Sequence, residues 1–209
     1  LDVEVRLSPR QRCPAAVGAD GIGRLAIPLG KEAQLALVRR QGLARLQAAR
    51  GDAARVYGET CPQYLLLSEE MLDRPGGERL VCAPPLRTPA DNEALWGGLA
   101  GEDLDVLATD HCPFTRADKR GHADFTTIPG GLPSIEARLG LAHHYGQQHG
   151  MTLARWVEVC CAAPARIFGL DRKGRIAPGY DADLVVFDPD RRRTLRAGVT
   201  LHERVDWSP

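Results

Sequence analysis

The order of short apolar runs and helix-like segments constrains this chain more than any other feature. Between residues 25 and 165, strand-like runs such as 54–57 and 104–109 alternate with segments that have helical periodicity or helix-capping residues. This alternation is typical of an α/β fold with parallel strands. The strand candidates are too few for a closed eight-stranded barrel, which takes about 250 residues. They would suit the last few units of one.

Periodicity and capping residues place the individual elements. Leucines with arginines on the opposite face predict a helix over 31–50, which Gly51 ends. Thr88 as N-cap, Pro89 at the first helical position and Asp91 in the first turn predict the start of another helix. Further expected elements are strands at 1–7, 25–27, 80–82 and 184–187 and helices that begin near 135, 152 and 164.

Charge and composition exclude some classes of function. The chain has 27 basic and 27 acidic side chains, and this balance argues against a nucleic-acid or membrane-surface binder. No apolar run approaches the ~20 residues of a membrane span, and no signal sequence is present. The six cysteines form no C-x-x-C pair, so we expect reduced thiols and a cytoplasmic location.

Asp110 is the strongest candidate for a catalytic residue. It follows the apolar run 104–109, where a predicted strand emerges into a polar loop. In a β/α barrel the active site lies at that edge, and a carboxylate there can ligate a metal or take a proton from a metal-bound water. The alternative is an aspartate that caps the next turn, and position alone does not separate the two.

The histidine and cysteine that follow Asp110 are expected to have structural roles. His111 and Cys112 follow Asp110 directly, but neighbouring side chains of an extended segment point to opposite sides. The three are therefore poorly placed to hold one ion, and we expect His111 to form local hydrogen bonds and Cys112 to pack.

Later in the chain, His143 and His144 are adjacent and lack the i, i+4 spacing of a helical metal pair. We expect them, with His149, to be surface or capping residues. Cys160 and Cys161 lie beside apolar residues of a predicted helix and are expected to be core thiols.

Several segments resemble one family in their order along residues 54–209. They are VYGETCPQYL (56–65), PPLR (84–87), ATDHCPF (108–114), IPGGLP (128–133), PARIFGL (164–170), KGRIA (173–177) and DADLVVFDP (181–189). Together they resemble the C-terminal portion of the hydantoinase/dihydropyrimidinase group of the amidohydrolase superfamily. PPLR alone is weak, whereas the ordered set is highly specific.

The resemblance implies a fold and a reaction. Family members have a metal-dependent (β/α)8 barrel and a small β-sandwich, and they open hydantoin or dihydropyrimidine rings by hydrolysis of a cyclic amide C–N bond. It implies barrel units in 54–170 and part of the sandwich in 171–209, after a poorly matching segment 1–53. The complete protein is expected to bind a binuclear zinc centre and a small cyclic amide or ureide, without nucleic acid or membrane, and to form a homo-oligomer.

Site residues follow from the same resemblance. Asp110 corresponds to the aspartate after the last barrel strand, which ligates a metal and transfers the proton. Main chain at Ala83, where Ser is common, and at Gly130, where Asn is common, corresponds to the substrate contacts. These side-chain differences put the substrate range in question.

The expected metal ligands upstream of Asp110 are missing from the sequence. Residues 1–110 contain no histidine, and Lys31 matches no ligand motif. If Arg24 to Gly30 is the strand that carries the last ligand histidine, Pro28 takes its place. We therefore expect this chain to be inactive in isolation. The alternatives are a non-catalytic homologue or gene remnant and, among enzymes, a dihydroorotase or allantoinase.

Overall fold

The computed structural model describes residues 22–28, 33–38, 40–51, 55–197, 205–207 and 209. The strand expected at 1–7 lies outside these residues. In the part of the chain that is described, no helix is both long and apolar enough to cross a membrane.

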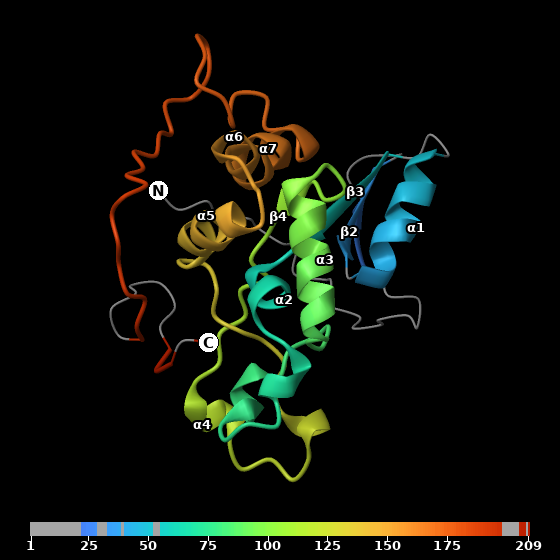
Figure 1. The fold of residues 1–209 in the computed structure, drawn as a ribbon, viewed down its shortest axis with the longest axis vertical. Helices are drawn as coiled ribbons and strands as arrows, with labels where there is room; N and C mark the ends of the chain where they lie inside the picture. Colours follow the sequence, from blue (N-terminus) through green and yellow to red (C-terminus); the bar gives the residue numbers. More distant parts are fainter. Residues whose placement is uncertain (1–21, 29–32, 39, 52–54, 198–204, 208) are drawn as a thin grey trace.

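One four-stranded sheet organises the first half of the described chain (Figure 1). Its strands lie in the order β1-β2-β3-β4. Strand β1 is antiparallel to β2, whereas β2, β3 and β4 are mutually parallel neighbours. The bounds are β1 Ile22–Pro28, β2 Ala33–Val38, β3 Arg55–Thr60 and β4 Val106–Leu107. The parallel arrangement predicted from the sequence is thus confirmed for the last three strands.

Helices follow the strands and cover the sheet. In Figure 1, α1 lies beside the sheet, α3 runs through the middle of the molecule, and α5, α6 and α7 gather near the top. The α-helices are α1 Arg40–Gly51, α2 Pro62–Leu66, α3 Pro89–Ala100, α4 Arg116–Lys119, α5 Arg138–Gln148, α6 Leu153–Val157 and α7 Ala163–Ile167. Short 3₁₀ helices span Glu69–Met71, Gly77–Leu80 and Phe125–Thr127, and a π-helical turn, Glu158–Ala162, joins α6 to α7.

The predicted helix starts at Thr88 and Thr152 are confirmed. Thr88 accepts a hydrogen bond from the Asp91 N–H, and the Asp91 carboxylate accepts one from the Thr88 N–H, so the two form a capping box. Thr152 accepts one from the Arg155 N–H. Both caps depend on residues within one turn, which explains why the sequence reveals them.

The helix predicted over 31–50 is wrong in its first part. Residues 33–38 form β2, and the helix α1 begins only at Arg40. Strand β2 pairs along its length with β3 on one side and with β1 on the other. Pairing on both edges satisfies its backbone groups and outweighs the weak helical periodicity of the segment.

Three other predicted strands are shortened or absent. Only Val106–Leu107 of the run 104–109 is strand. Leu80 ends a 3₁₀ turn, and Val81 and Cys82 follow it without joining a ladder before the cis Ala83–Pro84 bond. Residues 184–187 also form no strand, because no other described segment pairs with them. A β-sandwich is therefore not present in the described residues.

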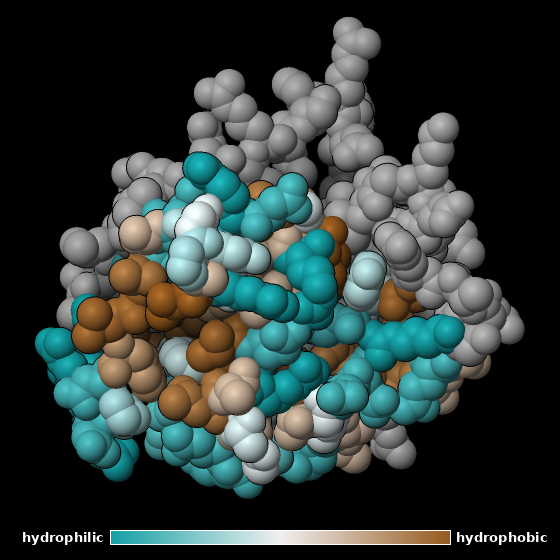
Figure 2. All heavy atoms as spheres, turned by 90° about the horizontal axis from the view of Figure 1, so that it is seen from above, coloured by the Kyte–Doolittle hydropathy of each residue, from teal (hydrophilic) through white to brown (hydrophobic). Residues whose placement is uncertain are grey.

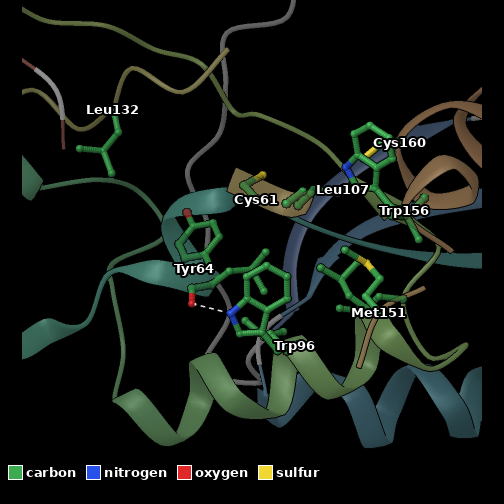
Figure 3. Close-up of a cluster of buried hydrophobic side chains, with 14 of the residues drawn as sticks. Cys61, Tyr64, Trp96, Leu107, Leu132, Met151, Trp156 and Cys160 are labelled. Carbon is green, nitrogen blue, oxygen red and sulfur yellow. Dashed lines mark hydrogen bonds between the residues drawn. The ribbon is translucent and has the colours of Figure 1, made fainter. Parts of the chain in front are cut away.

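The hydrophobic core lies between the sheet and the helices α2, α3, α5 and α6. Trp96 of α3 is buried, and its indole N–H donates to the Leu65 carbonyl at 3.0 Å (Figure 3). Leu107 of β4 and Trp156 of α6 belong to the same cluster. This packing holds the ends of β3 and β4 in place, and the next residues along the chain form the candidate site.

Candidate active site at the ends of β3 and β4

Asp110 lies three residues beyond β4, where the chain leaves the sheet. Its φ is +48°, in the left-handed region, and it is the only non-glycine residue with a positive φ among the described residues. Such a conformation costs energy for an L-residue and is found often at functional sites. Asp110 is exposed as a whole residue. Nearby protein atoms nevertheless displace enough water from its carboxyl group to raise the pKa of that group.

Gln63 joins Asp110 to the end of the neighbouring strand. It lies in α2, directly after β3, and its Nε2 donates to Asp110 Oδ2 at 3.4 Å. Gln63 Oε1 and the nearby Thr60 Oγ1 are buried, and the described residues offer neither a hydrogen-bond partner. Buried polar atoms without a hydrogen-bond partner are rare. These two oxygens can therefore still form hydrogen bonds that the described residues do not supply.

Glu59 is a second carboxyl group at this edge. It is the penultimate residue of β3 and pairs in register with Val106 of β4. Burial, and then the charge of Asp110, raise the pKa of Glu59 to about 7. Glu59 was not predicted from the sequence to be a site residue. Its position at the end of a strand parallel to the one that precedes Asp110 was the signal that could have identified it.

The same charge affects the thiol of Cys82. Burial, and then the charge of Asp110, raise the pKa of Cys82 to about 12. Cys82 directly precedes Ala83, so the predicted backbone position at Ala83 lies on a segment within electrostatic reach of Asp110.

Ala83 and Gly130, the two predicted main-chain substrate contacts, are close together. A Cβ atom placed on Gly130 would lie 3.4 Å from Ala83 N and 3.6 Å from Ala83 Cβ. The Gly131 N–H donates to the Val81 carbonyl at 3.1 Å, which ties the two segments together. A bridge between His111 and Leu132 connects the second segment to the chain just after Asp110.

His111 forms local hydrogen bonds, as predicted. Its Nδ1 accepts from the backbone N–H groups of Ser134 at 3.0 Å and Ile135 at 3.3 Å. Burial lowers its pKa, which is consistent with a neutral ring that accepts these bonds, although Glu136 partly opposes the shift. Cys112 is exposed rather than buried, and its backbone and Cβ lie against Gly131, where any added side chain would collide.

The later histidines and cysteines are only partly as predicted. His143 is buried, contrary to the surface prediction, because it packs edge-on against Trp156 at 5.4 Å between ring centres. His144 is exposed, and His149 follows α5 and stacks on Trp96 at 4.9 Å. Cys160 is a core thiol, whereas Cys161 is exposed, because adjacent positions of a helical turn face different directions. The sequence shows that the two cysteines are adjacent, but it does not show which of them faces the core.

The described residues do not form a metal site by themselves. They contain no group of three or more His, Cys, Asp or Glu side chains that could hold an ion. A binuclear zinc centre needs several nitrogen or oxygen ligands for each ion, and Asp110 with Glu59 nearby is not such a set.

The chain is similar to known proteins over most of its length. A model of the amidohydrolase family matches residues 43–204, and the chain belongs to this family. It is 45% identical over 173 residues to a D-hydantoinase of Streptomyces coelicolor, covering 80% of this chain and 37% of that protein. It is 41% identical over 172 residues to a D-phenylhydantoinase of Escherichia coli, with the same coverage of 80% and 37%.

Solved structures agree with these relatives. The D-hydantoinase (dihydropyrimidinase) from Thermus sp. superimposes with a TM-score of 0.75 at 35% identity, over 80% of this chain and 38% of that one. The described sheet and helices thus correspond to part of the barrel fold of the family. The chain spans about 37% of the length of the relatives that it matches.

Proposed function

We propose that this chain is part of a cyclic amidohydrolase that opens hydantoin or dihydropyrimidine rings by hydrolysis of a cyclic amide C–N bond. The observation that carries the proposal is the position of Asp110 at the carboxyl ends of β3 and β4, in a chain 45% identical to a D-hydantoinase. The carboxyl ends of barrel strands are where enzymes of this architecture place their chemistry.

In this proposal Asp110 transfers a proton. A carboxylate oxygen of Asp110 takes a proton from the water that attacks the ring carbonyl. The C–N bond of the ring then breaks, and the same carboxyl group gives the proton to the leaving nitrogen. A raised pKa suits a group that must hold the proton between these two steps. Gln63 orients the carboxylate through its Nε2.

Main chain at Ala83 and Gly130 would hold the substrate. The two positions are adjacent, exposed and free of bulky side chains, so a flat ring can approach their backbone groups closely. Ser and Asn are common at these positions in the family, and their replacement leaves the choice between hydantoin, dihydropyrimidine, dihydroorotate and allantoin to experiment.

The complete protein would supply what these residues lack. We propose a binuclear zinc centre to which Asp110 contributes one ligand, a barrel completed by further strands, a β-sandwich and a cytoplasmic homo-oligomer. The 209-residue chain by itself should not hydrolyse these substrates. A non-catalytic homologue is the second candidate, because residues 1–110 contain no histidine and Lys31 matches no ligand motif.

The test assays the protein encoded by the complete reading frame on hydantoin, dihydrouracil, dihydroorotate and allantoin, with added zinc. Hydrolysis of at least one of the four supports a cyclic amidohydrolase, and the preferred substrate identifies the subclass. The 209-residue chain is assayed in parallel. Two zinc ions bound per chain together with hydantoin turnover by this chain alone would contradict the predicted inactivity. A complete protein that hydrolyses none of the four supports the non-catalytic alternative.

Replacement of Asp110 tests the mechanism. Asp110→Asn keeps the shape of the side chain and its contact with Gln63 but cannot accept the proton. Because positioned acid–base groups contribute about 10²- to 10⁴-fold to rate, we expect kcat of the complete protein to fall by about that factor. The control is Asp91→Asn in the exposed α3 cap, which should leave kcat unchanged. Full turnover by the Asp110 variant would remove the role given to this residue.

A further inference from the structure

Lys119 is fully buried, which is unusual for a lysine. It ends α4, in the long segment between Asp110 and Gly131. Its Nζ donates to the Val81 carbonyl at 2.7 Å and lies 5.5 Å from the centre of the Phe114 ring. Burial lowers its pKa, although the Cys82 and Cys112 thiols oppose the shift.

Packing alone does not account for a lysine at this place. None of the ion pairs between described residues involves Lys119, so no carboxylate among these residues offsets the loss of water around its ammonium. A methionine has a similar length and would fill the space without that desolvation cost. What the lysine adds is a strong, charge-assisted hydrogen bond aimed at one backbone carbonyl.

That carbonyl connects the two backbone segments of the candidate site. Val81 O accepts from Lys119 Nζ and also from the Gly131 N–H, at 3.1 Å, which uses both of its lone pairs. Val81 lies two residues before Ala83, and Gly131 follows Gly130. The position of the Val81 carbonyl therefore sets how closely Gly130 approaches the backbone of Ala83.

We propose that Lys119 is a positioning residue that clamps the Val81 carbonyl and thereby fixes the spacing between Ala83 and Gly130. The inference rests on the proposed function insofar as these two positions hold the substrate. The clamp itself is a property of the free chain, so it can be tested without any ligand.

The first test measures amide hydrogen exchange in the 209-residue chain and in Lys119→Met. We expect exchange of the Gly131 amide to be at least tenfold faster in the variant. Exchange of the Trp156 amide, which donates to the carbonyl of the α6 N-cap Thr152, should be unchanged. The thermal midpoint should not fall. Lys119→Arg restores a charged donor and should keep Gly131 exchange within threefold of the wild type.

Three results would overturn the proposal. One is unchanged Gly131 exchange in a folded Lys119→Met chain. Another is equally faster exchange at Gly131 and Trp156 with a lower thermal midpoint, which would show a general contribution to stability. The third is failure of Lys119→Met to fold, which would make Lys119 a structural residue.

The second test adds hydantoin as the probe and follows the amide signals of Ala83 and Gly130. The dissociation constant for hydantoin should rise at least tenfold in Lys119→Met. The matched control, Lys173→Met, removes an exposed lysine that pairs with Asp181 and should leave it unchanged. If the wild-type chain shows the expected exchange but does not bind hydantoin, the clamp stands and the proposed substrate site is contradicted. If Lys119→Met and Lys173→Met bind hydantoin equally well, the proposed link between the Lys119 clamp and substrate binding is overturned.

Discussion

At the scale of residues, Glu59 and Asp110 place two carboxyl groups at the ends of adjacent strands. Burial, followed by the charge of Asp110, raises the pKa of Glu59 to about 7. Near neutral pH Glu59 is therefore present in both its protonated and its ionised form. Burial also raises the pKa of Asp110, and acidic groups with raised pKa values are typical of sites that transfer protons.

The raised pKa of Glu59 predicts how stability depends on pH. The folded state holds a proton on Glu59 up to about pH 7, whereas the unfolded chain loses it near its ordinary value of 4.5. The free energy of unfolding should therefore fall as pH rises from about 5 to 7, by about 1–3 kcal/mol from this group. Urea unfolding at a series of pH values measures the slope, which Glu59→Gln should remove. Glu69→Gln, at an exposed position, is the control; an unchanged slope in Glu59→Gln would contradict the assignment.

The sequence predicts some residues of the site better than others. Asp110 could be identified because the end of an apolar run is a local feature. Ala83 and Gly130 became candidates only through resemblance, and the structure brings them together. Three further residues stand out only through their surroundings in the fold: Lys119, Glu59 and Gln63. Their burial and neighbours depend on contacts between segments far apart in the chain, which periodicity does not contain.

At the scale of elements, features that depend on local hydrogen bonds could be predicted from the sequence. Features that depend on pairing between distant segments could not. The start of α3 was predicted because its cap consists of Thr88 and Asp91, three residues apart. The change from β2 to α1 within 33–51 was not predicted, because β2 exists through its pairing with β1 and β3. The absence of a strand at 184–187 has the same origin, since an extended apolar run becomes a strand only beside a partner.

The α3 cap allows a prediction of how much the free energy of unfolding changes when Thr88 is replaced. Thr88→Ala removes the side-chain acceptor of the Asp91 N–H and should lower the free energy of unfolding by about 1 kcal/mol. Thr88→Ser keeps an acceptor and should cost less than half as much. Urea unfolding of both variants measures the difference. Equal losses in the two would show that the methyl group of Thr88, rather than its cap, is the stabilising feature.

At the scale of the whole molecule, the segment 171–197 continues beyond α7 as a long stretch without helix or strand (Figure 1). Several of its apolar side chains are exposed. Viewed from the side of α6 and α7, apolar residues gather around a hollow (Figure 2). Ile176 is 90% exposed and Val186 100% exposed, whereas Phe187 is 38% exposed. An apolar patch of this kind promotes association or poor solubility of the isolated chain.

Phe187 is the residue that anchors this segment. Its ring lies 4.6 Å from that of His143 and 4.8 Å from that of Trp156, between centres. Phe187→Ala should therefore release the segment, whereas Val186→Ala, at a fully exposed neighbour, should not. Limited trypsin digestion measures the release, because the segment contains Arg191 and further basic residues.

Release should change the rate of cleavage without unfolding the rest of the molecule. If removal of the Phe187 ring costs about 1–2 kcal/mol of docking, the open population, and with it the rate of cleavage, rises about 5- to 30-fold. The core around Trp96 should stay intact, because the Trp96 indole of α3 bonds to the Leu65 carbonyl of α2, whereas the Phe187 ring contacts the cluster at Trp156 of α6. Cleavage that accelerates equally in Val186→Ala would show that Phe187 is no anchor. Cleavage throughout the core of Phe187→Ala would instead show that segment and core unfold as one unit.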